Sequence, residues 1–166
     1  PMPQGRVLVT YGSIPDTVAV NMSRVINIDG SDAQSLNRGE YLAQMQIINI
    51  IDFLRRYIPG FENSYLLESA STLGVRESRR MTGKYTLSAA DVIECKRFDD
   101  AVARGSYIID IHNPGGSSSG AIGGRIKGDY YEIPLRCLMS EKINNLFAAG
   151  RCISADHVAH SSSRVQ

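Results

Sequence analysis

The sequence lacks the bulk features of nucleic-acid-binding and membrane-spanning proteins. Its 18 lysines and arginines almost balance 17 aspartates and glutamates, and the formal net charge of +1 gives no general attraction to polyanions or anionic membranes. No apolar run approaches the roughly 20 residues that a membrane-spanning helix requires. Residues 1–5 carry neither the basic segment nor the apolar core of a secretory signal. A chain that starts Pro-Met is expected to be an excised piece, so the compartment stays open, with the cytoplasm as the default.

Motifs for metal, disulfide and phosphate chemistry are also missing. Cys95, Cys137 and Cys152 form no CxxC pair, which favours free thiols over a zinc knuckle or redox dithiol. No HExxH motif is present, so no metal site is expected although His157 and His160 are close in sequence. A glycine-rich loop has P-loop spacing, but the lysine and hydroxyl residue that must follow it are absent. The dinucleotide fingerprint GxGxxG occurs nowhere in the chain.

What the sequence does contain is typical of a soluble globular domain. Apolar residues make up 43% and charged residues 21%, and 166 residues suffice for one domain with a real core. The apolar patterns and turn residues predict an α+β fold, mainly antiparallel sheet with one long and one or two short helices. Strands are expected at 6–11, 24–29, within 65–87 around Thr82-Gly83, at 106–112, 130–136 and 146–149.

The long helix is the clearest element of this pattern. Asn37 and Glu40 resemble a capping pair at its start, and Pro59-Gly60 ends it. A stripe of apolar residues at helical spacing predicts that the helix packs deeply into the core. The stripe consists of Leu42, Met45, Ile48, Ile51 and Leu54, widened by Ile47 and Ile50. Ser88 with Asp91 forms a second capping signal, which opens a shorter helix.

Residues 74–80, GVRESRR, concentrate three arginines and a glutamate. On a strand, Arg76 and Arg80 would share one face, and Glu77 would lie on the other. A guanidinium can hold a carboxylate through two parallel hydrogen bonds, so Arg76 is a candidate for binding an anionic ligand or fixing a carboxylate. The alternative is a solvated charged strand with an internal arginine–glutamate pair, and a basic strand that binds nucleic acid is a third interpretation.

His112 is the candidate acid–base group. It ends an expected strand and precedes Asn113-Pro114, which places it at the rim of the sheet. An unperturbed imidazole titrates near neutral pH, so the residue can exchange a proton under physiological conditions. A structural histidine at a sheet rim is the competing interpretation.

The C-terminal segment predicts a ligand contact. Leu146 to Ala149 read as a short buried strand that ends at Gly150, where backbone can approach a ligand closely. Arg151 follows, and then a polar stretch rich in serine and histidine begins. His157, His160 and Arg164 would share one face if that stretch is helical.

Several of these motifs, taken in order, resemble one family. Gly74 to Arg80, followed by GKYTL and Asp91-Val92, is similar to the GxRExRRxxGxYxLxxxDV signature of the FAD-dependent oxidoreductases that are widespread in bacteria. Residues 106–114, SYIIDIHNP, resemble the next block of that family. Residues 131–134 and the segment NLFAAGRCIS at 145–154 resemble its closing block. The resemblance covers about residues 38–166.

The resemblance implies a two-domain flavoprotein of which this chain is a fragment. A Rossmann-type half with GxGxxG would hold most of the FAD and would lie N-terminal to this sequence. Residues 1–140 would form the substrate domain, and 141–166 would begin the segment that returns to the FAD-binding domain. Related flavoproteins often carry an acid after the glycine where this chain has Arg151. FAD, the missing half and a small-molecule substrate are therefore the expected partners.

The resemblance also implies the function and the site. The intact protein would transfer a hydride between an organic substrate and FAD, with Arg76 and His112 as catalytic candidates, and this piece alone is expected neither to hold FAD nor to be active. The expected cofactor-binding residues are Ala149, Gly150, Arg151, Cys152, Ile153 and Ser154. A non-catalytic module that binds a small ligand or a partner subunit is the alternative.

Overall fold

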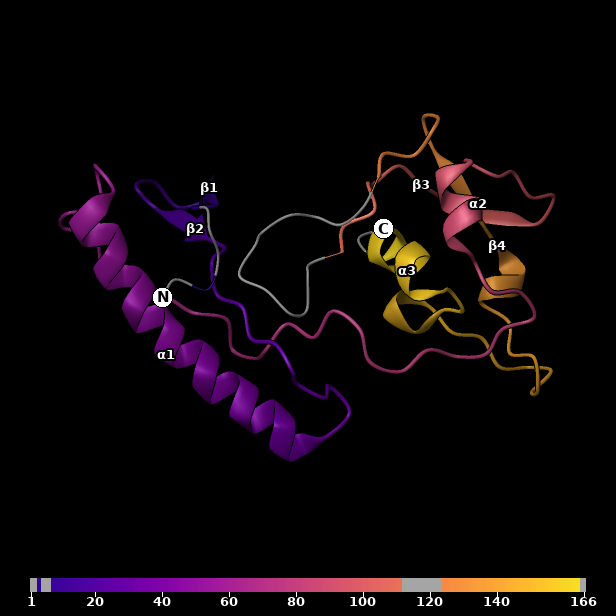
Figure 1. Cartoon of the computed structure of the whole chain (residues 1–166), viewed down its shortest axis with the longest axis horizontal. Coiled ribbons are helices and arrows are strands. Elements are labelled where there is room, and N and C mark those ends of the chain that lie inside the picture. The colour runs from indigo at the N-terminus through magenta and orange to yellow at the C-terminus, as the bar shows by residue number, and fades with distance from the viewer. Residues whose placement is uncertain (1–2, 4–6, 112–123, 165–166) are drawn as a thin grey trace. The chain divides into compact units, whose positions relative to one another are not determined.

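The computed structural model describes Pro3, residues 7–111 and residues 124–164. These residues fall into two compact units, one ending at Val75 and the other beginning at Arg76 (Figure 1). The combination of helices with short antiparallel sheets confirms the α+β class. The assignment of 1–140 to a substrate domain and of 141–166 to a returning segment stays a prediction. No helix in the described ranges is both long and apolar enough to cross a membrane.

The first unit combines a β-hairpin with the long helix. Strands β1 (Val9–Tyr11) and β2 (Val18–Val20) pair antiparallel, and α1 runs over Ala33–Tyr57 beside them (Figure 1). The small core of this unit consists of Met22 with Ile50 and Leu54 of α1. Because a two-stranded sheet offers little surface for burial, most of the apolar residues in this unit remain partly exposed.

The long helix is confirmed, but its start and its buried face differ from the prediction. Asp32, not Asn37, is the N-cap, and its carboxylate accepts a hydrogen bond of 2.7 Å from Ser35 N. The helix ends at Tyr57, just before Pro59-Gly60. The expected stripe is buried only at its C-terminal end, because Met45 and Ile48 are 46% and 61% exposed.

The expected strand at 24–29 is wrong. The described backbone there makes no ladder, and Asn27 has a φ of 58°, which no regular strand accommodates. The side chain of Gln46 on α1 takes the place of a neighbouring strand. Its Oε1 accepts from Arg24 N at 2.8 Å, and its Nε2 donates to Arg24 O at 2.7 Å.

The second unit contains the larger core. Its elements are α2 (Ala89–Ile93), β3 (Ala101–Gly105), β4 (Tyr131–Pro134), the short 3-10 helices η1 (Leu135–Cys137) and η2 (Gly150–Cys152), and α3 (His157–Ser163). Strands β3 and β4 pair antiparallel, with Gly105 opposite Tyr131. The fully buried side chains include Leu87, Val92, Tyr131 and Cys137.

Asp156 joins the two helices of this core. Its Oδ1 accepts from Ala159 N in the first turn of α3, and its Oδ2 accepts from Ala89 N at the start of α2, each at 2.7 Å. The predicted capping box of α2 is confirmed: Asp91 N donates to the Ser88 hydroxyl, and the Asp91 carboxylate accepts from Ser88 N. Polar side chains thus satisfy the first N–H groups of both short helices.

Four expected strands in this unit have different outcomes. The strand at 130–136 is confirmed as β4. The two expected around Thr82-Gly83 are wrong, since that stretch makes only isolated bridges, from Gly83 to Ser140 and from Leu87 to Ala155. The strand expected at 106–112 is also wrong, because residues 106–111 are irregular and the strand lies earlier, in β3. The carbonyl of Tyr107 accepts from Ser162 of α3 instead of from a strand.

Gly105 offers a test of this packing. A Cβ built at Gly105 would overlap the ring of Tyr131, which is fully buried and cannot move aside. Gly105→Ala should therefore lower the free energy of unfolding by about 1–3 kcal/mol through overpacking. Gly124→Ala is the matched control, because a Cβ at Gly124 meets nothing within 4 Å. Urea denaturation of both variants measures the difference, and equal effects would contradict the proximity of Gly105 and Tyr131.

Candidate functional site

The turn at Gly150 is the exposed end of the second unit. Gly150 has a φ of 73°, a conformation that L-residues rarely adopt, and a Cβ there would meet nothing within 4 Å. Gly150, Arg151 and Cys152 form the short helix η2, and all three are exposed. The backbone of this turn is therefore accessible to a flat or anionic ligand without a side chain in the way.

His160 supports this turn from inside the unit. Its side chain is 1% exposed, and its Nε2 lies 2.9 Å from the carbonyl oxygen of Arg151. Because a carbonyl can only accept, Nε2 carries a proton, and in the neutral ring Nδ1 is the unprotonated nitrogen. Burial lowers the pKa of His160 below the ordinary imidazole value, and the Arg151 carbonyl and the charge of Glu77 only partly oppose this effect.

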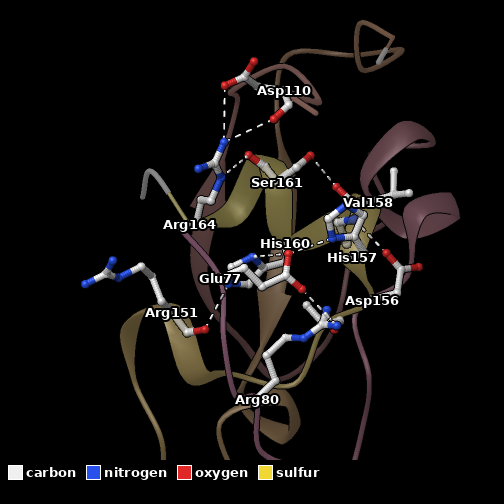
Figure 2. A network of polar contacts seen from close by, with 12 residues as sticks. Glu77, Arg80, Asp110, Arg151, Asp156, His157, Val158, His160, Ser161 and Arg164 are labelled. Carbon is white, nitrogen blue, oxygen red and sulfur yellow. Dashed lines mark hydrogen bonds and ion pairs between the residues drawn. The ribbon is translucent and has the colours of Figure 1, made fainter. Parts of the chain in front are cut away.

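Glu77 lies at the centre of the polar network above α3. Figure 2 shows its carboxylate among His157, His160 and Arg80. His157 Nδ1 lies 2.7 Å from Glu77 Oε2, and Arg80 Nη2 lies 3.0 Å from Glu77 Oε1. His160 Nδ1 is 3.9 Å from the same carboxylate, too far for a hydrogen bond, and it has no hydrogen-bond partner among the described residues. Arg80 also donates to the carbonyl of Ala155.

A second carboxylate, Asp110, joins two arginines on the same unit. Arg76 Nη1 and Arg164 Nη2 each lie 3.3 Å from Asp110 Oδ2, and Arg164 Nη2 also donates to the Asp110 carbonyl at 3.1 Å. Arg164 is almost buried, whereas the side chain of Arg76 is 51% exposed. Asp110 therefore fixes Arg76 while half of that side chain remains open to solvent.

The charges of this region leave a positive excess. Three arginines, Arg76, Arg80 and Arg164, pair with two carboxylates, Glu77 and Asp110, in the contacts of this network. In Figure 2 the guanidinium of Arg151 points away from Glu77, although its carbonyl is bound by His160. An excess of guanidinium groups over carboxylates in one network favours a ligand with negative charge.

The predicted cofactor residues divide into exposed and buried members. Ile153 and Ser154 are 6% and 2% exposed, and Ser154 N donates to Cys137 O at 2.9 Å, so their amides serve the unit's own backbone. Ala149, Gly150, Arg151 and Cys152 remain exposed. The contacts of all these residues with a cofactor stay a prediction.

The cysteines contribute no assembled redox or metal chemistry. Burial raises the pKa of the Cys137 thiol to about 11, so it stays protonated and unreactive at neutral pH. Cys152 is exposed, and its thiol donates to Ala149 O at 3.1 Å. The described part of the chain holds no group of histidine, cysteine and acidic side chains that could bind a metal ion.

The strand expected before the turn is wrong. Leu146 and Phe147 are 44% and 56% exposed, and the segment makes one isolated bridge, from Phe147 to Met139. Ala148 N donates to Leu138 O at 2.8 Å, which pairs one edge of the segment. The apolar side chains of Leu146 and Phe147 are therefore not buried by the other described residues of this unit.

The structure brings Arg76 together with Asp110, but His112 lies outside the described residues. The catalytic roles of Arg76 and His112 stay predictions. The prediction missed the central positions of Glu77, Asp110 and His160. One signal was present, since the shared helical face of His157, His160 and Arg164 is the face that carries the network. The partner carboxylates come from distant segments, which spacing along the chain does not reveal.

The comparison with known proteins gives one family. The family model described as FAD dependent oxidoreductase matches residues 4–166, nearly the whole chain. No curated protein and no solved structure was found to match the chain. The resemblance read from the motifs at 74–92, 106–114 and 131–154 is confirmed at the level of the family.

His160 makes the stability of this unit depend on pH. Its pKa is depressed in the folded state, so the unfolded chain binds a proton first as the pH falls below about 6.5. The contribution of the neutral ring is thus present above that pH and is lost below it. The measurement spans pH 7.5 to pH 5.5, about one unit either side of the imidazole pKa. Over this range the free energy of unfolding should decrease more in the wild type than in His160→Gln. The control is His157→Gln, whose ring is exposed, and equal pH dependence in wild type and His160→Gln would contradict the assignment.

Proposed function

The chain belongs to the FAD dependent oxidoreductase family, and we propose that the protein which contains it transfers a hydride between an organic substrate and FAD. In this proposal the second unit supplies one side of the flavin site, and the chain also forms the substrate cavity. FAD, when bound, accepts or donates the hydride, while the residues of this chain bind, orient and exclude water.

The exposed turn at Gly150 is the observation that carries the proposal. A positive φ, an open Cβ direction and an exposed backbone suit close approach to a flat ring or to its ribityl chain. The hydrogen bond from His160 to the Arg151 carbonyl stiffens the turn from below. Gly150, Arg151 and Cys152 would hold the cofactor through backbone N–H groups and the arginine charge.

The surrounding charge fits the same group. The positive excess of the arginines favours the phosphates of FAD and the negative charge that a flavin gains on reduction. Arg76, fixed by Asp110 and half exposed, would orient an anionic group there. His112 remains the candidate for proton transfer.

The residues of this chain fit only part of an FAD site. A pyrophosphate needs a cradle of backbone N–H groups at a glycine-rich turn, and GxGxxG occurs nowhere in the sequence. We propose that polypeptide outside these 166 residues holds the pyrophosphate, in a Rossmann-type half. This chain alone should then bind FAD weakly or not at all.

A pair of glycine variants tests the role of the turn. Gly150 and Gly60 both have positive φ, and a Cβ at either meets nothing within 4 Å, so valine strains the backbone at both positions. Each variant should lose about 1–3 kcal/mol of stability. Gly150→Val alone should weaken FAD binding, by about tenfold or more, because only its turn contacts the flavin. The readout is FAD affinity of the full-length protein by flavin fluorescence titration.

Two results would contradict the proposal. The wild-type full-length protein should be yellow after reconstitution with FAD, and a colourless protein would remove the basis for a flavin site. Equal FAD affinity in the Gly150→Val and Gly60→Val variants would show that the turn does not contact the cofactor.

A further inference from the structure

The first unit contains a cavity of about 1250 Å³, and Gly150 is not among the residues that line it. Three segments line it: the β1–β2 hairpin, one face of α1, and the irregular stretch from Gly60 to Gly74. All of these residues belong to the same compact unit. The cavity is large enough to hold an organic molecule of ordinary ligand size.

The cavity wall carries negative charge without positive charge. Asp16, Glu40, Glu62 and Glu68 line it, and no lysine, arginine or histidine does so among the described residues. None of these four carboxylates forms an ion pair within the described part of the chain. This negative charge is opposite in sign to the excess of arginines in the Glu77 and Asp110 network of the second unit. An anionic head group would meet repulsion here, whereas a cation would be attracted.

The face of α1 that lines the cavity changes in character along its length. Near the start of the helix the lining side chains are polar, and toward its end they are apolar. The polar group is Asn37, Glu40, Tyr41 and Gln44, and the apolar group is Ile47, Ile50, Ile51 and Leu54. Spacings of three and four residues place each group on one face of the helix. The α1 wall of the cavity is therefore polar toward the start of the helix and apolar toward its end.

Glu40 is the fixed group at the polar end. Its side chain is half-buried, and its Oε1 accepts a hydrogen bond of 3.2 Å from Leu73 N. This bond holds the carboxylate in place while Oε2 remains for another donor. Gly39 beside it packs closely against Leu73 and Ile28. An ammonium group donates three hydrogen bonds and would compensate the negative charge.

We propose that this cavity binds an organic cation with an apolar chain, its ammonium head against Glu40 and its chain along the isoleucines of α1. The inference rests on the proposed function, because it names the class of substrate that the flavoenzyme would take. Binding itself needs only the first unit's side chains. It can therefore be measured whether or not flavin is present.

Three probes of equal chain length test the proposal on the full-length protein. Octylammonium, 1-octanol and octanoate share the apolar tail and differ in the charge of the head group. Isothermal titration at neutral pH should give octylammonium an affinity about tenfold or more above that of octanoate, with 1-octanol between them. Added salt should weaken octylammonium binding and leave 1-octanol binding unchanged.

Glu40→Gln isolates the charge of the site. Glutamine can still accept from Leu73 N through its amide oxygen, so the wall keeps its shape while the charge is lost. This variant should bind octylammonium about tenfold more weakly and 1-octanol as before. Asp52→Asn is the matched control, because Asp52 also lies on α1 but does not line the cavity and pairs with Arg56. Circular dichroism would verify that both variants fold.

Several outcomes would overturn the inference. They are equal or tighter binding of octanoate, unchanged octylammonium binding in Glu40→Gln, an equal loss in Asp52→Asn, and no binding of any probe. The last result would indicate that polypeptide fills the cavity. A colourless protein that still prefers octylammonium would refute the flavin site and leave the cavity's ligand class intact. A yellow protein that prefers octanoate would support the flavin site and refute the cationic ligand of the cavity.

Discussion

The hydrogen bond from the His160 ring to the Arg151 carbonyl is the contact on which the candidate flavin site depends. It crosses from the buried face of α3 to the exposed turn, and it ties the conformation of Gly150 to the core. The neutral state of His160 is part of this arrangement, because burial disfavours its charged form. Glu77 lies beside the ring without bonding to it, and its charge is held by His157 and Arg80.

The two units differ in the charge around their candidate sites. In the network of Glu77 and Asp110 the second unit has more arginines than carboxylates, and the described residues that line the cavity of the first unit include carboxylates but no cationic side chain. A flavin brings phosphates and gains negative charge on reduction, which the arginines would stabilise. A cationic substrate would be attracted by the carboxylates. With this division, neither ligand competes for the site of the other.

Local signals in the sequence predicted the elements that local physics determines. The capping box at Ser88 and the periodicity of α1 depend on residues within one or two turns, and both were found. The strands at 24–29 and 106–112 failed because a strand needs a partner, and Gln46 and Ser162 take that place. In the site, the helical spacing of His157 and His160 was visible. The approach of Glu77 and Asp110 depends on the tertiary fold, which one sequence does not display.

Asp156 has a consequence for how the second unit moves. One carboxylate accepts from the first turn of both α2 and α3, so a movement of Asp156 would remove one hydrogen bond from each helix. The two helices should therefore open as a single cooperative unit, and their amide protons should exchange with solvent at matching rates. Since α3 also carries His160, which bonds the Arg151 carbonyl, a movement of Asp156 would also affect the turn at Gly150.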